Sequence, residues 1–380
     1  MDRKNSEQAR ILKWSGVEAP RVSLLASVYN DRSHLEESIA SVLSQDLPLE
    51  LILIDGGSSD GSLDRMRRLT DERFTLLAYE KNPGRAAARN ESARFARAPW
   101  LCFFDPDVVF LPGALAGFVQ AIENTKGAEW AYCGIEYADP ADPGAQGSFD
   151  VLRMLGENMV PDDLFAVQHD VLMEMGGYPV TRKSGGDYAL KLRLMERGDP
   201  LFFDRICAHS RSPHMNKAGA RSDGAEGIRE EFRKYIVETS SHPDIEKKRK
   251  IIRSALFLKE AAKDRRWADV LRYGEYLTSR GVSGFALDQQ MAHALCEQGH
   301  LNPAWQIAIQ WIAKIVEGRH VLPGEALWAV TASLKLALMC KDFEKVSMLM
   351  PLAESVHQVI PDRKLKRYIN RGHLLARGSA

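Results

Sequence analysis

The chain has 380 residues, 45% of them hydrophobic, which is enough for two or three globular domains. Lysine plus arginine equals aspartate plus glutamate at 51 each, and this zero net charge gives no global electrostatic case for a nucleic acid or an anionic membrane, although local patches remain open. The five cysteines are widely spaced without a CxxC pair, which argues against a disulfide framework and a zinc site.

The amino terminus, MDRKNSEQARILKW, is too polar for a signal peptide. No window of the sequence approaches the roughly 18–20 apolar residues that a membrane span requires. These features predict a cytoplasmic protein with no transmembrane segment, and peripheral attachment to a membrane is the alternative location.

The first half of the sequence alternates strand and helix patterns. In chain order the predicted elements are a strand at 22–28, a helix at 34–45, a strand at 49–55, a helix at 63–69, a strand at 74–80, a helix at 82–98 and a strand that ends at Asp105. Repeated strand–helix–strand units predict a Rossmann-like α/β fold, with a mainly parallel sheet and helices on both faces.

Polar residues follow each of these four strands. They are Ser27 to Asp31, Asp55, Asn82 to Arg85, and Asp105 with Asp107. Ligands of such sheets bind beyond the carboxyl ends of the strands, so these residues predict one shared site.

The most informative stretch is FFDPD, where Asp105 and Asp107 interrupt an apolar run. Two carboxylates among buried residues need a cation or hydrogen-bond donors, although a turn with solvated aspartates is the simpler alternative. Mg²⁺ or Mn²⁺ meets that need and commonly retains substrate phosphates as further ligands. The pattern therefore predicts a divalent metal and a phosphate-bearing ligand.

Four motifs in order, VSLLASVYND, LILIDGGSSDGS, NPGRAAARN and FFDPD, resemble the inverting family 2 glycosyltransferases of GT-A fold. The later segment MGGYPVTRKSGGDYALKLRLMERG resembles the acceptor-side block of that family. The resemblance covers about residues 20–215 and implies transfer of a sugar from a nucleotide-sugar donor.

The resemblance assigns donor-binding roles to three strand-end residues. Ser27 and Tyr29 match positions that hold the nucleotide base, although Tyr29 is alternatively a buried core tyrosine. Asp55 matches the carboxylate that accepts a hydrogen bond from a uracil-type N–H. Many members have a second aspartate next, where this chain has Gly56.

The glycine-opened helix supplies the next candidates. Gly84 lets the backbone approach the donor, and Arg85 or Arg89 is expected to meet a pyrophosphate oxygen or the uracil. For each arginine, a solvated helix face is the alternative.

The same resemblance assigns a different role to each of three aspartates. Asp107 matches the metal ligand, and Asp105 the residue that contacts the ribose, or the metal through water. Asp187 matches the base that removes the acceptor hydroxyl proton, with a helix N-cap as the alternative role. Most members have an acid before this base, where this chain has Gly186.

A late segment, AHSRSPHMNKAGARS, matches a region where some members place a basic residue and a histidine near the diphosphate. Arg211 is the predicted donor contact there, and His214 the predicted additional metal ligand. His209 competes for the metal role, and solvated histidines are the alternative.

The composition changes after about Pro243, and helical spacing replaces strand patterns. Trp267, Leu301 and Phe343 each open a second helix after a polar turn, which resembles tetratricopeptide-type repeats; a plain helical bundle is the alternative. The predicted domains are an N-terminal extension at 1–19, the GT-A domain at 20–240 and an α-helical domain at 241–380.

The resemblance thus implies a metal-dependent inverting glycosyltransferase that uses a nucleotide-sugar donor, with uracil as the expected base. The acceptor is expected to be a glycan, a lipid-linked molecule or a protein. Its helical domain is expected to present a surface to a protein partner. A nucleotidyltransferase and a non-catalytic, nucleotide-binding scaffold are the alternatives, the latter because of Gly56 and Gly186.

Overall fold

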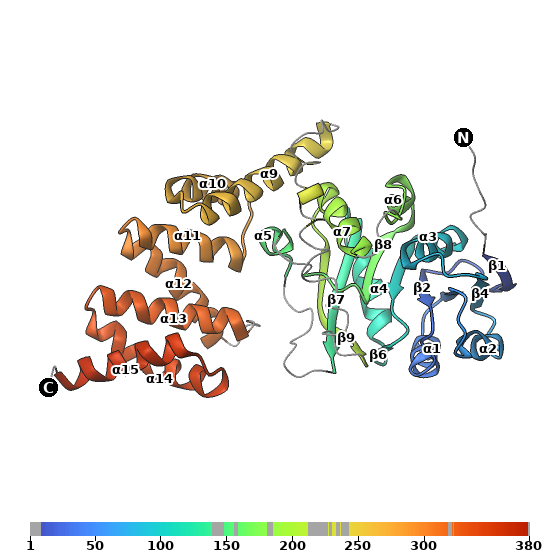
Figure 1. The fold of residues 1–380 in the computed structure, drawn as a ribbon, viewed down its shortest axis with the longest axis horizontal. Helices are drawn as coiled ribbons and strands as arrows, with labels where there is room; N and C mark the ends of the chain where they lie inside the picture. Colours follow the sequence, from blue (N-terminus) through green and yellow to red (C-terminus); the bar gives the residue numbers. More distant parts are fainter. Residues whose placement is uncertain are drawn as a thin grey trace. The chain divides into compact units, whose positions relative to one another are not determined.

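The computed structural model shows two compact units (Figure 1). It describes residues 9–138, 148–155, 159–180, 185–211, 227, 230–232, 236, 243–317, 321 and 323–378. One unit comprises Met1–Phe149 with Met154–Lys248, and the other Asp150–Arg153 with Arg249–Ala380. Each unit is described by itself below.

The first unit is built on a nine-stranded sheet with the order β1-β4-β3-β2-β5-β8-β7-β9-β6. The strands are β1 (Arg10–Lys13), β2 (Val22–Val28), β3 (Leu49–Asp55), β4 (Phe74–Ala78), β5 (Trp100–Phe104), β6 (Val108–Phe110), β7 (Trp130–Tyr137), β8 (Leu164–Gln168) and β9 (Leu201–Ser210). Strands β2, β3, β4 and β5 run parallel, whereas β8 is antiparallel to both β5 and β7. The predicted α/β class is confirmed, and antiparallel pairs flank the parallel strands on both sides, β1 with β4 and β8 with β5.

Helices pack on both faces of this sheet. They are α1 (Leu35–Leu43), α2 (Ser62–Arg67), α3 (Arg85–Phe95), α4 (Ala114–Asn124), α6 (His169–Glu174) and α7 (Gly186–Arg197). Alternate β2 residues such as Leu24 and Ala26 join a core with Ile39 of α1 and Phe118 of α4. Helix α3 packs on β2 and β3 and carries Arg89 to Phe103 of β5.

The strand order places a topological switch point between β2 and β5. From β2 the chain proceeds outward to β3 and β4, and then returns to pair β5 with the other side of β2. Val28 lies beside Asp55 across β2 and β3, so the carboxyl ends of these strands meet at one edge. Ligands of doubly wound sheets bind at such an edge.

The predicted boundaries differ most at helix α3. It begins at Arg85 rather than residue 82, because Asn82 to Gly84 form a turn in which Asn82 Oδ1 accepts a hydrogen bond from Gly84 N at 2.8 Å. Gly84 has φ +88°, which favours glycine over residues with a Cβ atom. Strand β1, which pairs antiparallel with β4, lies within the predicted N-terminal extension.

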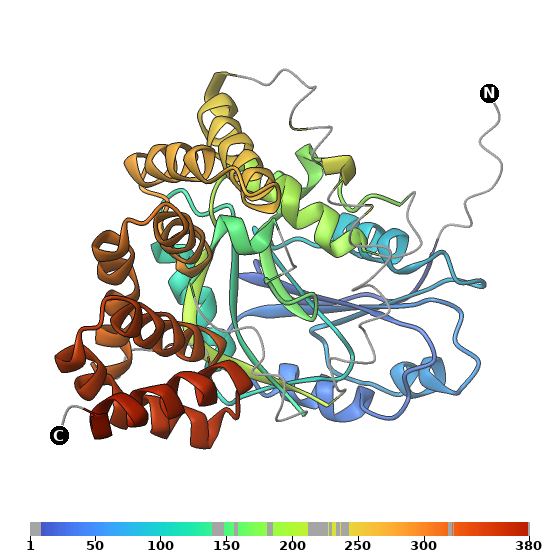
Figure 2. The same ribbon diagram turned by 60° about the vertical axis from the view of Figure 1, so that its left-hand side comes forward.

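The second unit is helical (Figure 2). Its helices are α5 (Val151–Met154), α9 (Pro243–Lys263), α10 (Trp267–Ser279), α11 (Phe285–Glu297), α12 (Leu301–Val316), α13 (Pro323–Met339), α14 (Phe343–Val359) and α15 (Arg363–Gly378). Consecutive helices from α10 to α15 contact each other. Two residues of the segment 150–153 attach to this unit: Asp150 accepts from Ala286 N at 3.0 Å, and Leu152 O accepts from Lys259 Nζ at 3.1 Å.

One turn geometry recurs three times in the helical unit. Arg265, Gly299 and Lys341 have φ values of 56°, 80° and 54°, two residues before α10, α12 and α14 begin. In each turn the next N–H donates to the carbonyl five residues earlier, with distances of 2.8, 2.8 and 3.0 Å. This pattern ends one helix and starts the next, which supports a helix-pair repeat. The tetratricopeptide resemblance stays a prediction.

Candidate active site

Asp55, at the carboxyl end of β3, has one carboxylate oxygen that accepts hydrogen bonds and one that has no partner in the described part of the chain. Asp55 Oδ2 accepts hydrogen bonds from Gly57 N at 2.8 Å and Ser58 N at 3.0 Å. Asp55 is fully buried, and its Oδ1 has no hydrogen-bond partner among the residues that the structure describes. A buried acceptor of this kind is costly unless something donates to it.

The end of the neighbouring strand β2 carries the two other predicted base contacts. Ser27 is half-buried within β2, whereas Tyr29 follows the strand with 52% of its surface exposed. Tyr29 is therefore no core tyrosine, which removes the alternative role for its ring. A Cβ atom at Gly56 would lie 3.5 Å from the Tyr29 side chain, so position 56 borders the ring.

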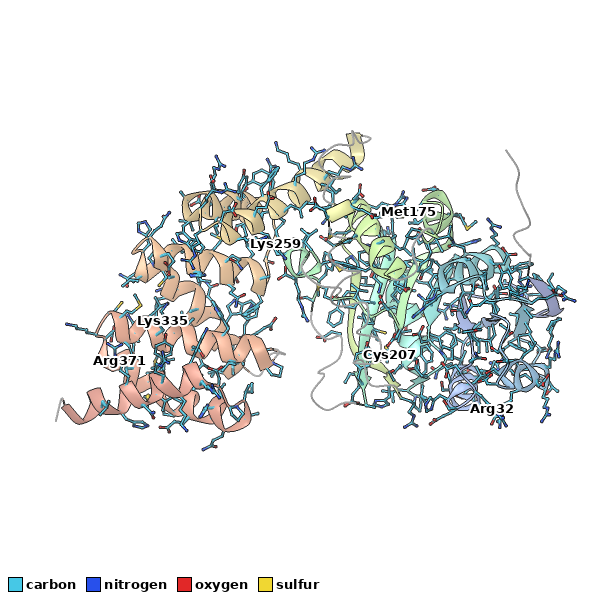
Figure 3. All side chains as sticks on the ribbon, in the orientation of Figure 1. Arg32, Met175, Cys207, Lys259, Lys335 and Arg371 are labelled. Atoms are coloured by element: carbon cyan, nitrogen blue, oxygen red, sulfur yellow. The ribbon has the colours of Figure 1, made fainter. Side chains whose placement is uncertain are left out.

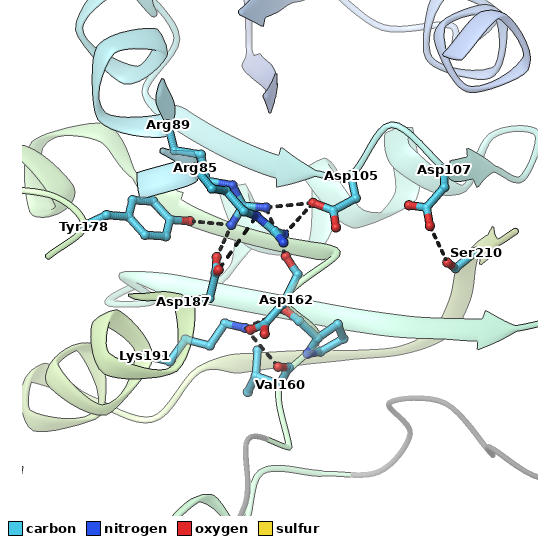
Figure 4. A network of polar contacts seen from close by, with 11 residues as sticks. Arg85, Arg89, Asp105, Asp107, Val160, Asp162, Tyr178, Asp187, Lys191 and Ser210 are labelled. Carbon is cyan, nitrogen blue, oxygen red and sulfur yellow. Dashed lines mark hydrogen bonds and ion pairs between the residues drawn. The ribbon is translucent and has the colours of Figure 1, made fainter. Parts of the chain in front are cut away.

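Four charged side chains from α3, β5 and α7 form one network (Figure 4). Asp105 Oδ1 accepts from Arg85 Nη2 at 2.6 Å and from Arg89 Nη2 at 2.8 Å. Arg89 Nη1 also forms an ion pair and hydrogen bond with Asp187 Oδ1. One guanidinium therefore joins the predicted catalytic base to the predicted ribose contact.

Arg89 is 1% exposed, so the solvated helix face is excluded for this residue. Its guanidinium lies 5.6 Å from the ring centroid of Phe103 and 5.5 Å from that of Tyr178. Burial raises the pKa of the Tyr178 phenol well above its ordinary value, so its neutral oxygen accepts from Arg89 Nη1 at 3.4 Å. Arg85 differs, because 42% of its side chain is exposed.

Asp187 lies in the first turn of α7, next to the helix N-terminus. The N-cap is Gly185, and no side chain caps the helix, so Asp187 does not have the alternative N-cap role. Its Oδ2 lies 3.9 Å from Arg85 Nε and makes no hydrogen bond within the described part of the chain.

The Gly-Gly-aromatic turn before α7 is tied to α3 by Asn90. Asn90 Oδ1 accepts from Tyr178 N at 2.7 Å, and Asn90 Nδ2 donates to Tyr178 O at 2.9 Å. Gly177 has φ +75°, and a Cβ atom there would lie 2.3 Å from Asn90 Oδ1. Glycine at 177 is therefore required for this close approach, which sets Tyr178 against Arg89.

Asp107 occupies the loop between β5 and β6, and it is 3% exposed. Its Oδ2 accepts from Ser210 Oγ at 3.4 Å, and its backbone oxygen accepts from Arg211 N at 3.0 Å. The Arg211 guanidinium pairs instead with Glu37 of α1, so the structure brings only its backbone to Asp107.

The two histidines have different outcomes. His209 pairs through Nδ1 with Glu136 Oε2 at 2.8 Å, on the adjacent strand β7. His214 lies outside the described residues. Within the described part of the chain, no group of three histidine, cysteine, aspartate or glutamate side chains is placed to hold a metal by itself.

Lys191 is a buried residue of this region that the sequence reading missed. It is fully buried on α7, and its Nζ donates to Val160 O at 2.9 Å, Pro161 O at 2.7 Å and Asp162 Oδ1 at 2.5 Å. It thereby ties the segment before β8 to the helix that carries Asp187. A lysine four residues after a candidate base, on the same helix face, was the available signal.

Comparison with known proteins shows what this domain is similar to. Residues 23–140 match the model of glycosyl transferase family 2. TuaG of Bacillus subtilis, whose name assigns it to teichuronic acid biosynthesis, is 36% identical over 91 residues, which are 23% of this chain and 36% of TuaG. Glycosyltransferase AglE of Haloferax volcanii is 26% identical over 208 residues, 51% of this chain and 68% of AglE.

A third relative has a more detailed name. It is the UDP-Glc:alpha-D-GlcNAc-diphosphoundecaprenol beta-1,3-glucosyltransferase WfgD of Escherichia coli, which is 33% identical over 95 residues. These residues are 25% of this chain and 38% of WfgD, so the chain spans about a third of the lengths of TuaG and WfgD.

Solved structures show the same fold. The crystal structure of S. aureus TarS residues 1–349 matches with a TM-score of 0.51 and 13% identity, over 83% of this chain and 88% of that one. Its complex with UDP-GlcNAc also has a TM-score of 0.51, over 89% of this chain and 92% of that one. The described helices include none long and apolar enough to cross a bilayer. Within the α/β unit, residues 23–140 thus resemble glycosyl transferase family 2.

Proposed function

We propose that this chain is a metal-dependent inverting glycosyltransferase that transfers a sugar from a UDP-sugar to an acceptor hydroxyl. The proposal depends most on one observation: Arg89 joins Asp187, the proposed base, to Asp105, the proposed donor contact. The buried Arg89 guanidinium thus holds both the residue proposed to contact the donor and the residue proposed to take the proton of the acceptor.

The donor base is proposed to lie at Asp55 and Tyr29. The Asp55 Oδ1 atom, buried without a partner in the described structure, supplies an acceptor for the N–H of uracil. Tyr29 offers an exposed aromatic face beside it, and Ser27 a hydroxyl in the same strand. The UDP-GlcNAc bound to TarS and the UDP-Glc in the name of WfgD favour uracil as this base.

The diphosphate is proposed to lie between Arg85 and Asp107. Arg85 and Arg89 are balanced by Asp105 and Asp187, so a diphosphate needs further positive charge. A buried carboxylate at a strand end suits Mg²⁺ or Mn²⁺, which bind through one or two carboxylates plus phosphate oxygens. Asp107 is the proposed ligand, and a bound divalent cation supplies Lewis-acid stabilisation of the leaving diphosphate. His214 stays a predicted further ligand.

The two arginines are proposed to have different roles, although the sequence treats them alike. Arg85 is exposed enough to exchange Asp105 for a donor phosphate oxygen, next to Gly84 at the helix N-terminus. Arg89 is too buried for that exchange, so its role is to position Asp105 and Asp187. Arg211 reaches the diphosphate only if its guanidinium leaves Glu37.

The transfer step uses the two oxygens of Asp187 differently. Oδ1 is anchored by Arg89, and Oδ2 is left to accept the proton of the acceptor hydroxyl. As that proton moves to Asp187, the hydroxyl oxygen attacks the anomeric carbon, and the bond to the nucleoside diphosphate breaks on the opposite side. The product is inverted at that carbon.

The chain is proposed to act on a glycan, lipid-linked or protein acceptor through its GT-A domain at 20–240. The helical region at 241–380 is proposed to serve a protein partner. The glycosyltransferase names of TuaG and WfgD support glycan assembly as the setting.

Asp187→Asn tests the proposal. Release of UDP from UDP-glucose and UDP-GlcNAc is measured with and without Mn²⁺, with water and then a panel of hydroxyl-bearing glycans as acceptors. The variant should lose about 10²–10⁴-fold in rate, because general base catalysis is worth that much. Its UDP affinity should change little. UDP release that does not depend on Mn²⁺, or equal rates for the parent and Asp187→Asn, contradicts the proposal. UDP binding by the parent without any turnover favours the non-catalytic scaffold.

A further inference from the structure

Helix α15 has one face built of basic side chains, and the proposed glycosyl transfer makes no use of it. Residues 363–378 contain no aspartate or glutamate. Among the side chains described in this helix, the exposed arginines and lysines are Arg363, Lys364, Lys366, Arg367 and Arg371. In a chain with zero net charge, this is a local concentration of positive charge rather than a general property.

The opposite face of α15 fixes which residues point outward. Leu365 and Ile369 are buried in the core of the helical unit. Gly372 is also buried, and a Cβ atom there would lie 2.7 Å from Met350 Sδ of α14. With α15 held through these residues, the 100° turn per residue directs Arg363, Arg367 and Arg371 away from the core. Figure 3 shows the side chains of the helical unit, with Arg371 labelled.

These basic side chains have no acidic partners on their own helix or, among the described residues, elsewhere. No ion pair joins any of the five to an aspartate or glutamate in the part of the chain that the structure describes, whereas Arg266 and Arg272 on α10 both pair with Asp269. Among the side chains of α15 that the structure describes, His373 forms an ion pair with Glu354 of α14. The outer face therefore keeps its full positive charge.

An apolar side chain lies within the basic stripe. Leu374 is 70% exposed, and helical geometry places it between Arg363 and Arg367 around the helix axis. Phosphate groups would pair with the arginines through their opposite charge, and an adjoining hydrocarbon region would bury the apolar side chain of Leu374. An anionic lipid bilayer offers both, whereas a nucleic acid backbone offers only the phosphates.

We propose that the outer face of α15 binds the surface of a bilayer that contains acidic phospholipids. The arginines and lysines contact head-group phosphates, and Leu374 inserts at the boundary with the acyl chains. Attachment is peripheral and electrostatic, so it weakens as salt concentration rises. This inference is independent of the proposed transfer reaction and requires no donor or metal.

Cosedimentation of the full chain with vesicles tests this inference. The vesicles contain phosphatidylcholine alone or phosphatidylcholine with phosphatidylglycerol. The triple variant Arg363→Gln, Arg367→Gln, Arg371→Gln should partition about 100-fold more weakly to the acidic vesicles, since each basic residue contributes roughly fivefold. Leu374→Ser should weaken binding several-fold and leave its salt dependence unchanged.

A matched control removes three charges elsewhere. Arg68, Lys126 and Lys263 are exposed on other parts of the chain and make no ion pair with a described residue. Their triple glutamine variant should bind acidic vesicles like the parent. Circular dichroism and thermal unfolding confirm that both triple variants are folded, because neither set belongs to a buried core.

Three results overturn the inference. One is no preference of the parent for acidic vesicles, and another is equal loss in the α15 and control variants. The third is absence of vesicle binding combined with binding of a single-stranded oligonucleotide that depends on the same three arginines, which identifies a nucleic acid surface instead.

Discussion

The two units of this protein treat charge in opposite ways. The α/β unit buries charged side chains at the carboxyl edge of its sheet, including Asp55, Arg89, Asp187 and Lys191. The helical unit has an almost entirely apolar core and carries its charges on the surface, most densely on α15. Buried charge is costly unless it is paired, so its concentration in one unit marks where the chemistry is.

Asp150 is an informative exception in the helical unit, where Arg249 is also buried. Its Oδ1 accepts from Leu152 N at 2.8 Å and Arg153 N at 3.1 Å, and its Oδ2 accepts from Ala286 N at 3.0 Å. A Cβ atom at Gly284 would lie 2.5 Å from this Oδ2. One carboxylate thus caps α5 and α11 together, which is a structural role without catalysis.

Removing the shared guanidinium should have the largest effect on stability. Arg89→Leu leaves Asp105 and Asp187 buried with reduced compensation, and loss of one partner from a buried pair costs about 3–5 kcal/mol. Hydrogen exchange measured by mass spectrometry should show the loss in the α/β unit alone. Arg89→Lys keeps the positive charge but not the two Nη groups that contact Asp105 and Asp187. Its decrease in the free energy of unfolding should therefore be intermediate. A loss below about 1 kcal/mol would show that the network is only a surface-type contact.

The spare oxygen of Asp55 should matter for nucleotide binding. Asp55→Asn replaces one of the two carboxylate oxygens with an NH2 group, which cannot accept a hydrogen bond from uracil. The change should weaken UDP binding by about 1.5–3 kcal/mol, the contribution of a hydrogen bond to a charged group. Isothermal titration calorimetry measures the change. The control is Glu136→Gln, an exposed carboxylate on β7. Equal UDP affinity of parent and Asp55→Asn would remove Asp55 from the donor site.

Loss of Asp150, which caps both α5 and α11, should destabilise the helical unit and leave the α/β unit unchanged. Asp150→Ala removes acceptors from two helix N-termini and should lower the free energy of unfolding by about 1–2 kcal/mol. Faster hydrogen exchange is expected in α5 and α11, with Arg89 and its neighbours unaffected. Destabilisation spread evenly over both units would show that they unfold as one.

The smallest effect is expected at Arg211. Its pair with Glu37 is about half-exposed at both ends, and such pairs contribute roughly 0–1 kcal/mol. Arg211→Gln should therefore leave thermal stability nearly unchanged. A raised KM for the UDP-sugar in that stable variant would support the predicted contact with the diphosphate, and an unchanged KM would refute it.

The sequence predicted the parts of this fold that depend on local pattern. The strands at 22–28 and 49–55 have the predicted ends because mostly apolar runs bounded by polar residues define them. Strand β1 was not predicted, since Arg10–Lys13 has only two apolar residues and its pairing with β4 is long-range. Strand β7 and the antiparallel strand β8 were likewise not assigned.

The candidate site shows the same limit. Sequence order indicated that Asp55, Asp105 and Asp187 belong together, because each follows a strand or opens a helix. It gave no means of separating Arg85 from Arg89, which share one helix at four-residue spacing. Their difference arises from Tyr178, which is placed against Arg89 by the contact of Asn90 with a turn 88 residues away.

A thermal-shift screen of nucleoside diphosphates with and without Mn²⁺ tests the central claim most directly. UDP with Mn²⁺ should raise the unfolding temperature of the α/β unit more than GDP or ADP does, and Asp107→Ala should abolish the dependence on metal. Unfolding temperatures that are indifferent to every nucleotide, or the same UDP shift in Asp107→Ala, would contradict it.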